Sequence, residues 1–253
     1  MRALLLAAGE GQRLRPLTLR MPKPMVPVGG RPILAHLIGL LRRHGITEIA
    51  INLHYKPEVI VEYFGNGSTF GVTLTYAYEE QLLGSAGAAR ALRHFLNDTF
   101  LVLYGDVLTN VDLTSLMAFH RGSQSAGTIG LYEVSDPSRC GIVELNASDR
   151  VTRFVEKPAP GTIQGNLANS GILVFEPSVL QYISETGASD FGVHLFPALL
   201  KNGVPLSGKR LDGYILDIGA ADRLAQAEAD YASGAFQSPL DAQGAERGGN
   251  LAC

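Results

Sequence analysis

Cysteine is scarce in this chain, with only Cys140 and Cys253 among 253 residues. Two isolated cysteines make neither a disulfide framework nor a pair with metal-ligand spacing, and this pattern is typical of a reducing compartment. The histidines also lack ligand spacing; they stand at positions 36, 44, 54, 94, 120 and 194. We therefore expect neither a disulfide-stapled fold nor a histidine-ligated metal site.

Long apolar runs are absent as well. The run from Ala3 to Ala8 spans six residues, whereas a secretory signal needs a longer one and a membrane helix needs about 20. The net charge is −3, so nothing indicates a nucleic-acid partner. We expect a cytoplasmic protein without a membrane partner, in which positive charge is concentrated in a site.

The motifs of covalent catalysis are missing too. No Gly-x-Ser-x-Gly elbow occurs. The run from Gly203 to Lys209 looks like a phosphate-binding loop, but Arg210 replaces the Ser/Thr and Pro205 lies inside it. We interpret it as a chance match, and the chemistry need not pass through a covalent enzyme intermediate.

Strands and helices alternate through the first half of the chain, which favours βαβ units and a mainly parallel sheet. Hydrophobic patterning predicts strands at 3–8, 48–53, 72–78 and 100–104, and helices at 32–44, 58–64, 85–95 and 113–121. Strands predicted at 127–134, 141–145, 150–156 and 170–175 indicate an antiparallel addition, followed by helices at 177–184, 191–201 and 220–231. We expect one domain over residues 1–235 and a flexible C-terminal tail over 236–253.

Ligands of an open α/β sheet bind beyond the carboxyl ends of its strands. The first such place is the loop from Gly9 to Gly11, whose glycines let backbone N–H groups form an anion-binding nest beside Arg13. Leu14 stands where a dinucleotide fingerprint would need its third glycine. Lys23 follows between two prolines that hold it in an extended segment. An arginine and a lysine beside a nest suit a triphosphate.

The pattern Gly9-x-Gly11-x-Arg13-Leu14-x-Pro16-Leu17-Thr18 with Pro22-Lys23-Pro24 resembles the signature of the sugar-1-phosphate nucleotidylyltransferase family. Other landmarks of that family match in order: Leu83-Gly84-Ser85-Ala86-Gly87, Gly105-Asp106-Val107-Leu108, Phe154-Val155-Glu156-Lys157-Pro158, Asn169-Ser170-Gly171-Ile172 and Asp217-Ile218-Gly219. The resemblance covers roughly residues 1 to 232. It implies a Rossmann-like three-layer α/β sandwich with a mixed, mainly parallel sheet and a small antiparallel addition.

The resemblance also assigns roles. It implies catalytic roles for Arg13, Lys23 and Asp106, and Mg²⁺ bound by Asp106 and Asp217. Nucleotide contacts are implied for Leu6, Ala8, Gly9, Gly11, Glu79, Gly84, Ser85 and Ala86. Sugar-phosphate contacts are implied for Gly141, Glu156, Lys157 and Asn169. Two carboxylates plus phosphate oxygens suit Mg²⁺, although Asp217 could instead be the N-cap of the following helix, Asp106 a turn residue, and Glu156 and Lys157 the charged end of a hairpin.

Some positions depart from the family pattern. Gln12 stands where threonine or serine is frequent, and Ser85 stands where threonine is frequent. Asn110 occupies a position where a second acidic residue often follows the metal-binding turn, and Cys140 one where an aromatic residue is common. These departures leave the reaction type unchanged and bear on the identity of the substrate.

The activity implied by the resemblance is in-line attack of a sugar 1-phosphate on the α-phosphorus of a nucleoside triphosphate, with loss of pyrophosphate. Glu79 falls where relatives contact the base, and a carboxylate matches the two adjacent donors of guanine, which favours GTP. The run of residues 78–88 most resembles the mannose-1-phosphate guanylyltransferase branch of the family, which implies a mannose- or heptose-like sugar. Uridylyl or thymidylyl transfer to glucose 1-phosphate or an amino-sugar phosphate is the alternative, and a homo-oligomer, dimer or tetramer, remains open. A non-catalytic regulatory relative would lack Arg13, Lys23 or Asp106, and a glycosyltransferase would carry an Asp-x-Asp motif.

Overall fold

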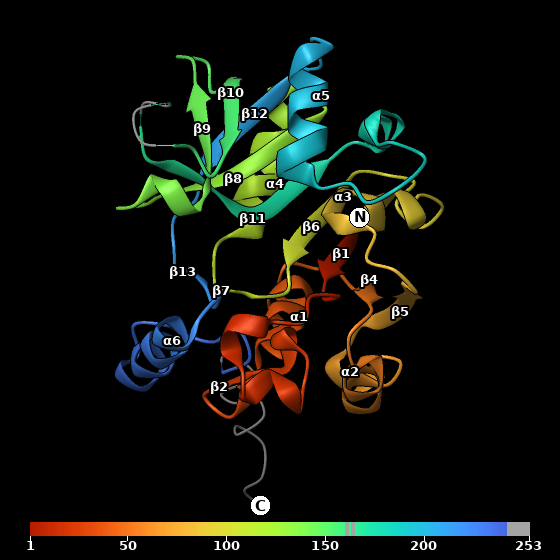
Figure 1. The fold of residues 1–253 in the computed structure, drawn as a ribbon, viewed down its shortest axis with the longest axis vertical. Helices are drawn as coiled ribbons and strands as arrows, with labels where there is room; N and C mark the ends of the chain where they lie inside the picture. The colour runs from red at the N-terminus through yellow and green to blue at the C-terminus, as the bar shows by residue number, and fades with distance from the viewer. Residues whose placement is uncertain (160–161, 163–164, 242–253) are drawn as a thin grey trace, which may run out of the picture.

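The computed structural model describes residues 1–159, 162 and 165–241, and its main feature is one mixed β-sheet. Its strands are β1 (Arg2–Leu6), β4 (Glu48–Leu53), β5 (Thr73–Tyr78), β6 (Phe100–Tyr104), β8 (Gly127–Glu133), β9 (Gly141–Leu145), β10 (Val151–Glu156), β11 (Leu167–Phe175) and β12 (Leu206–Arg210). The order is β10-β9-β11-β6-β1-β4-β5, while β8 pairs with β11 and β12 (Figure 1).

The sheet divides into a parallel and an antiparallel part. Strands β6, β1, β4 and β5 run parallel, and β11 runs antiparallel to β6, β8 and β9. This confirms the predicted mixed, mainly parallel α/β sheet with an antiparallel addition. The run that looks like a phosphate-binding loop lies at β12, which extends the sheet parallel to β8 and was not predicted as a strand.

Helices cover both faces of the sheet, which gives three layers (Figure 1). Alternate residues of β1 explain this, because Ala3 and Leu5 belong to one hydrophobic core and Leu4 to the other. The first core includes residues of α1 (Ile33–Arg43), α2 (Pro57–Phe64), α4 (Leu113–Ser123) and α6 (Ala221–Ser233). The second includes residues of α3 (Gly84–Ala91) and α5 (Phe196–Lys201). Within the described residues, no helix is both long and apolar enough to cross a membrane.

Several short elements escaped prediction because they have too few residues to show a period. They include the hairpin of β2 (Pro27–Val28) and β3 (Arg31–Pro32), and the pair of β7 (Val107–Thr109) and β13 (Ile215–Asp217). The helix predicted at 191–201 begins with a π-helical segment, Phe191–Leu195, before α5. The segment predicted as a helix at 177–184 is a 3₁₀-helix, Pro177–Tyr182.

The packed part of the chain extends beyond the expected domain boundary at residue 235. Phe236 is 1% exposed and Ser238 is 3% exposed, and Ser238 Oγ lies 2.7 Å from Nδ1 of the buried His36. Leu240 lies so close to α1 that a Cβ at Gly39 would be 2.4 Å from its Cδ2. Residues 236–241 are therefore folded onto the domain, and the rest of the expected tail, residues 242–253 with Cys253, lies outside the described residues.

Candidate active site

The glycine loop that follows β1 lies against the signature lysine. Gly11 has φ +68°, and a Cβ there would lie 2.8 Å from Cβ of Lys23, so both its conformation and this close approach require glycine. Thr18 Oγ1 donates to the carbonyl of Gly11 at 2.8 Å and closes the loop. Within the described part of the chain, the backbone N–H groups of residues 9–13 donate no hydrogen bond, so they remain available to an anion.

Lys23 is held differently from the sequence expectation. Pro22 is extended, but Lys23 begins a 3₁₀ turn, Lys23–Met25, rather than lying in an extended segment. The turn is set by the hydrogen bonds from Met25 N to the Pro22 carbonyl (2.9 Å) and from Val26 N to the Lys23 carbonyl (3.1 Å). These local bonds override the preference of a residue before proline, and they leave a buried lysine with a fixed direction.

Lys23 points to the two carboxylates assigned to the metal. Its Nζ pairs with Asp106 Oδ2 and lies 3.7 Å from Asp217 Oδ1. Asp106 directly precedes β7 and Asp217 ends β13, and these strands pair with Asp217 opposite Val107. Ile218 N also donates to the Asp106 carbonyl at 2.9 Å. The two aspartates, distant in sequence, are thus brought together by backbone pairing.

Arg13 reaches the same place. A Cβ at Gly219 would lie 2.9 Å from Arg13 Nη2 and 3.3 Å from Asp217 Oδ1. Gly219 therefore leaves the room in which the guanidinium and the carboxylate approach each other, a role that sequence reasoning did not assign. The N-cap of α6 is Ala220, and no side chain caps that helix, so the alternative of Asp217 as its cap is wrong.

The charges of this cluster act on each other. Burial and the neighbouring Asp106 carboxylate raise the pKa of Asp217, while Lys23 and Arg13 act in the opposite direction. The cluster thus contains two carboxylates and two cationic side chains. Cationic side chains suit anionic phosphates, and carboxylates suit a divalent cation.

The segment expected to hold the nucleotide runs into the first turn of α3, which is fixed by hydrogen bonds to residues 189 and 190. Ala86 N and Gly87 N donate to the Ser189 carbonyl at 2.8 and 2.9 Å. Ser85 donates to Asp190 Oδ1 through its backbone N (2.9 Å) and its Oγ (3.1 Å). Gly84 has φ +75°, and a Cβ there would lie 2.5 Å from the Ser189 carbonyl oxygen. Ser189 and Asp190 belong to no sequence motif, because their role arises only from this contact.

Glu79 is buried rather than exposed at the site surface. It is 8% exposed, and its two carboxylate oxygens accept from Asn52 Nδ2 at 2.8 Å and from Leu83 N at 3.0 Å. Both carboxylate oxygens of Glu79 thus already have a hydrogen-bond partner inside the protein. The sequence-based expectation that they contact guanine did not include these partners.

The expected sugar-phosphate loop lies at the end of β10. A Cβ at Gly141 would lie 2.7 Å from Glu156 Oε2, and one at Gly192 would lie 2.8 Å from the same atom, so two glycines make room for this carboxylate. Lys157 has φ +46°, and its Nζ lies 3.8 Å from Glu156 Oε1 with the side chain 68% exposed. Lys157 is therefore free to turn toward an incoming anion.

Tyr104 has neighbours in all three groups of candidate site residues: the charge cluster with Asp106, the first turn of α3 with Ser85, and the loop with Glu156. Burial raises the pKa of its phenol, which hydrogen-bonds Ser85 and has Asp190, Asp106 and Glu156 among its charged neighbours. A Cβ at Gly171 would lie 2.9 Å from the Tyr104 ring, which explains why β11 carries a glycine in the left-handed region there. Sequence reasoning missed Tyr104, since a tyrosine at a strand end carries no signal by itself.

Asn169 lies two residues from that glycine. Its Oδ1 accepts from Gly171 N at 3.0 Å, at an irregularity in the β11–β8 ladder. The side chain therefore shapes the strand beside Tyr104, and no direct bond joins it to Glu156 or Lys157 within the described residues.

Cys140 has the carboxylates of Asp217 and Glu156 among its charged neighbours. Burial raises the pKa of its thiol, a hydrogen bond from Tyr132 lowers it, and the carboxylates of Asp217 and Glu156 raise it again. The thiol therefore stays protonated near neutral pH.

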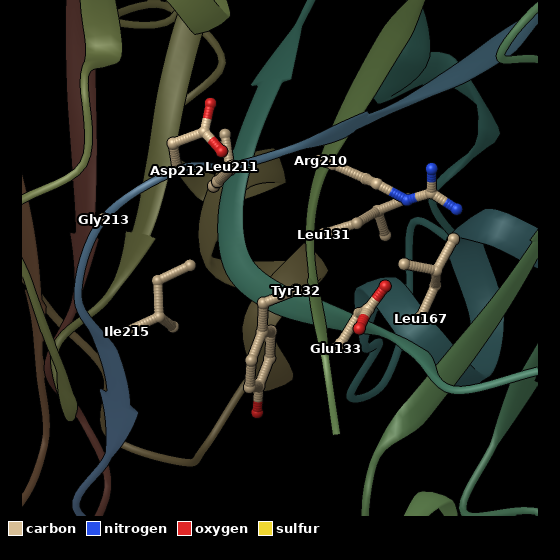
Figure 2. Close-up of a pocket in the computed structure, with 9 residues that line it drawn as sticks. All are labelled: Leu131, Tyr132, Glu133, Leu167, Arg210, Leu211, Asp212, Gly213 and Ile215. Atoms are coloured by element: carbon tan, nitrogen blue, oxygen red, sulfur yellow. The ribbon is translucent and has the colours of Figure 1, made fainter. Parts of the chain in front are cut away.

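A cavity of about 360 Å³ is lined in part by Tyr132, and Figure 2 shows all of its lining residues. Its polar groups come from Glu133, Arg210 and Asp212, and its apolar wall includes Leu167 and Ile215. None of the residues predicted for chemistry lines it. It is therefore separate from the cluster of Lys23, Asp106 and Asp217.

An open α/β sheet with a glycine loop, two cations and two carboxylates beyond its strand ends defines a protein that handles phosphate groups. The sequence profile described as nucleotidyl transferase matches residues 2–234, and the chain belongs to that family.

Individual relatives agree with this assignment. The chain is 38% identical over 240 residues to a mannose-1-phosphate guanylyltransferase of Mycobacterium tuberculosis, a match that covers 94% of this chain and 66% of the relative. It is 37% identical over 233 residues to a UTP–glucose-1-phosphate uridylyltransferase of Synechocystis sp., covering 87% and 60%. It therefore spans 60–66% of the length of these relatives.

A solved structure from Bacillus anthracis that carries the name glucose-1-phosphate thymidylyltransferase, in complex with sucrose, has the same fold. Its TM-score is 0.82 at 28% identity, and the match covers 90% of this chain and 94% of that one. The likeness extends across the antiparallel part of the sheet as well as the parallel part.

Proposed function

We propose that this chain transfers a nucleoside monophosphate from a nucleoside triphosphate to a sugar 1-phosphate and releases pyrophosphate. The observation that carries the proposal is the convergence of Lys23, Asp106 and Asp217, with Arg13 beside them, from segments far apart in the chain. A non-catalytic relative has no need to keep this charge cluster, so its retention favours an enzyme.

In the proposed reaction, a phosphate oxygen of the sugar phosphate attacks the α-phosphorus of the triphosphate. The bond from that phosphorus to the bridging oxygen breaks, and pyrophosphate leaves with the electron pair. Such a step requires positioning and neutralisation of charge rather than a side-chain nucleophile. Arg13 and the free N–H groups of residues 9–13 bind the leaving pyrophosphate, and Lys23 binds the phosphates that flank the reacting phosphorus.

The donor set fits Mg²⁺, which takes oxygen ligands and retains waters. Asp106 and Asp217 would hold it, with phosphate oxygens completing the shell, since no group of three or more potential ligand side chains occurs in the described residues. When bound, the ion supplies positive charge to the phosphate oxygens.

The sugar phosphate is proposed to bind on the Glu156 side. Lys157 binds its phosphate, while Glu156 and Asn169 contact hydroxyls, with Gly141 and Gly192 leaving the space around Glu156. A mannose- or heptose-like sugar is our first choice, because several curated relatives carry the name mannose-1-phosphate guanylyltransferase or guanyltransferase.

GTP is the proposed donor, and Leu6, Ala8 and the loop from Glu79 to Ala86 are proposed to bind its nucleoside. The uridylyltransferase and thymidylyltransferase relatives keep UTP and dTTP as the alternatives. The test is a pyrophosphate-release screen of the five common nucleoside triphosphates against a panel of sugar 1-phosphates. The proposal expects one triphosphate with one sugar phosphate to stand out, and absence of release in every pair would refute it.

A further inference from the structure

We infer that Asn52 is a positioning residue that, through Glu79, fixes the nucleotide loop relative to the phosphate loop. The inference rests on the proposed function and concerns how its nucleotide site is held. Asn52 belongs to no motif of the sequence signature, and it is 3% exposed at the end of β4.

The observation is a continuous chain of three hydrogen bonds. Ala7 N donates to Asn52 Oδ1 at 2.8 Å, Asn52 Nδ2 donates to Glu79 Oε1 at 2.8 Å, and Leu83 N donates to Glu79 Oε2 at 3.0 Å. Ala7 stands two residues before the glycine loop, and Leu83 directly precedes Gly84. The chain therefore connects the two loops that must bind one nucleotide at the same time.

The direction of each bond is determined by its partners. A backbone N–H can only donate, so Asn52 must turn Oδ1 toward Ala7 and Nδ2 toward Glu79. A carboxylate can only accept, so Glu79 suits both Asn52 and Leu83. Since these groups are buried, a mismatched pair would leave a polar group without a partner, which is unfavourable.

This arrangement changes the part played by Glu79. Both its oxygens are directed at protein donors, so its carboxylate holds the loop rather than reading guanine with both oxygens. Preference among bases then depends on where the loop backbone lies, and the loop's position depends on Asn52.

The test is a double-mutant cycle with Asn52→Asp and Glu79→Gln, because the two changes are complementary. Asn52→Asp alone sets a second acceptor against Glu79. In Glu79→Gln alone, the new side-chain NH₂ group is a donor that faces another donor, either Asn52 Nδ2 or Leu83 N, in both orientations of the amide. In the double variant the carboxylate at position 52 accepts from Ala7 and from the amide at position 79, whose oxygen accepts from Leu83. All three bonds and the net charge are restored.

We expect each single change to weaken GTP affinity by about tenfold or more, and the double variant to recover to within about threefold of the wild type. Affinity is measured by isothermal titration with Mg²⁺ and GTP, alongside KM for each substrate, kcat and Tm. A positioning role predicts that KM for GTP moves and recovers while KM for the sugar phosphate stays constant. The matched control is the double variant Asn66→Asp/Glu62→Gln on the exposed surface around α2, where Asn66 Oδ1 accepts from Ser68 N; it should match the wild type.

Three results would overturn the inference. One is a double variant no better than its weaker single parent. Another is recovered affinity with the preference for GTP over dTTP still lost, which would show that the charge of Glu79 reads the base directly. The third is a fall in Tm that alone accounts for the loss in the singles. If the wild-type protein uses a different triphosphate, only the preference for GTP is overturned, and the double-mutant cycle is repeated with that nucleotide. If the wild-type protein binds no nucleoside triphosphate, both the proposed function and the positioning role are overturned.

Discussion

The proposed phosphate end of the candidate site, around Lys23 and Asp106, and the proposed base end, around Glu79 and Ser85, are built in opposite ways. At the phosphate end, Lys23, Asp106 and Asp217 meet at a cluster with the backbone N–H groups of residues 9–13 left free. At the base end, Glu79 and Ser85 have their polar atoms bonded to the protein itself. Ligand binding in the first region therefore depends on charged and donor groups that are available to a ligand. Ligand binding in the second region depends on a shape that internal hydrogen bonds hold in place.

This contrast has a physical reason. Phosphates are multiply charged and differ little among nucleotides, so attraction suffices to bind them. Bases are neutral and differ in ring number and in the pattern of donors and acceptors on their edges, so discrimination requires protein groups at fixed positions. Changes at the phosphate end should therefore reduce turnover, and changes at the base end should reduce affinity, selectivity or loop stability.

The largest effect is expected for Asp106→Asn, which keeps the shape but removes a charge at the phosphate end. Loss of metal-held charge stabilisation should raise the barrier by several kcal/mol, which lowers kcat on the order of a hundredfold or more. Steady-state pyrophosphate release measures it, with circular dichroism to verify folding. Asp212→Asn, on the exposed loop before β13, is the control, and near-normal turnover of a folded Asp106→Asn enzyme would refute the assignment.

The next effect separates the two lysines. Lys23→Ala should weaken triphosphate binding by roughly ten- to a hundredfold, because a hydrogen bond to a charged group contributes about 1.5–3 kcal/mol. Lys157→Ala should instead raise KM for the sugar phosphate by about tenfold. Direct titration of each substrate distinguishes them, and a Lys157→Ala enzyme that loses only nucleotide affinity would reverse the roles.

A smaller effect on turnover is expected for Gly219→Ala. The added Cβ would lie 2.9 Å from Arg13 Nη2, so the guanidinium must move, and misplacement of a catalytic group should lower kcat on the order of tenfold. Tm should stay close to that of the wild type, because the displaced group is the end of a flexible side chain. Gly122→Ala is the matched control, since nothing lies within 4 Å of its added Cβ; equal kcat values for the two variants would contradict the role of Gly219.

The smallest effect on kcat is expected at the base end, for Gly84→Ala. A Cβ there meets the Ser189 carbonyl at 2.5 Å in a left-handed conformation, and such strain costs about 1–3 kcal/mol. The loss should be visible as a lower Tm and weaker nucleotide binding, with kcat at saturation changed little. A variant with unchanged Tm and reduced kcat would break the contrast between the two ends.

The sequence by itself determined the fold class and the composition of the charge cluster. Alternating apolar runs specify strands and helices because burial has the period of the element, and the motifs around Arg13, Lys23, Asp106 and Asp217 are contiguous enough to be recognised one by one. The conformation of Lys23 and the length of the packed C-terminal segment were misjudged, because hydrogen bonds to the neighbouring turn and packing on α1 override local preference.

Only the tertiary structure decided which groups are free and which are already used. Asn52, Tyr104, Ser189 and Asp190 carry no motif, and they gain their roles by meeting residues from distant segments. The same is true of Glu79. The sequence predicts that its carboxylate contacts a ligand, whereas in the fold it accepts hydrogen bonds from Asn52 and Leu83. A sequence shows which donors and acceptors a chain has, but their pairing is fixed by distance and direction, which exist only after the strands have come together.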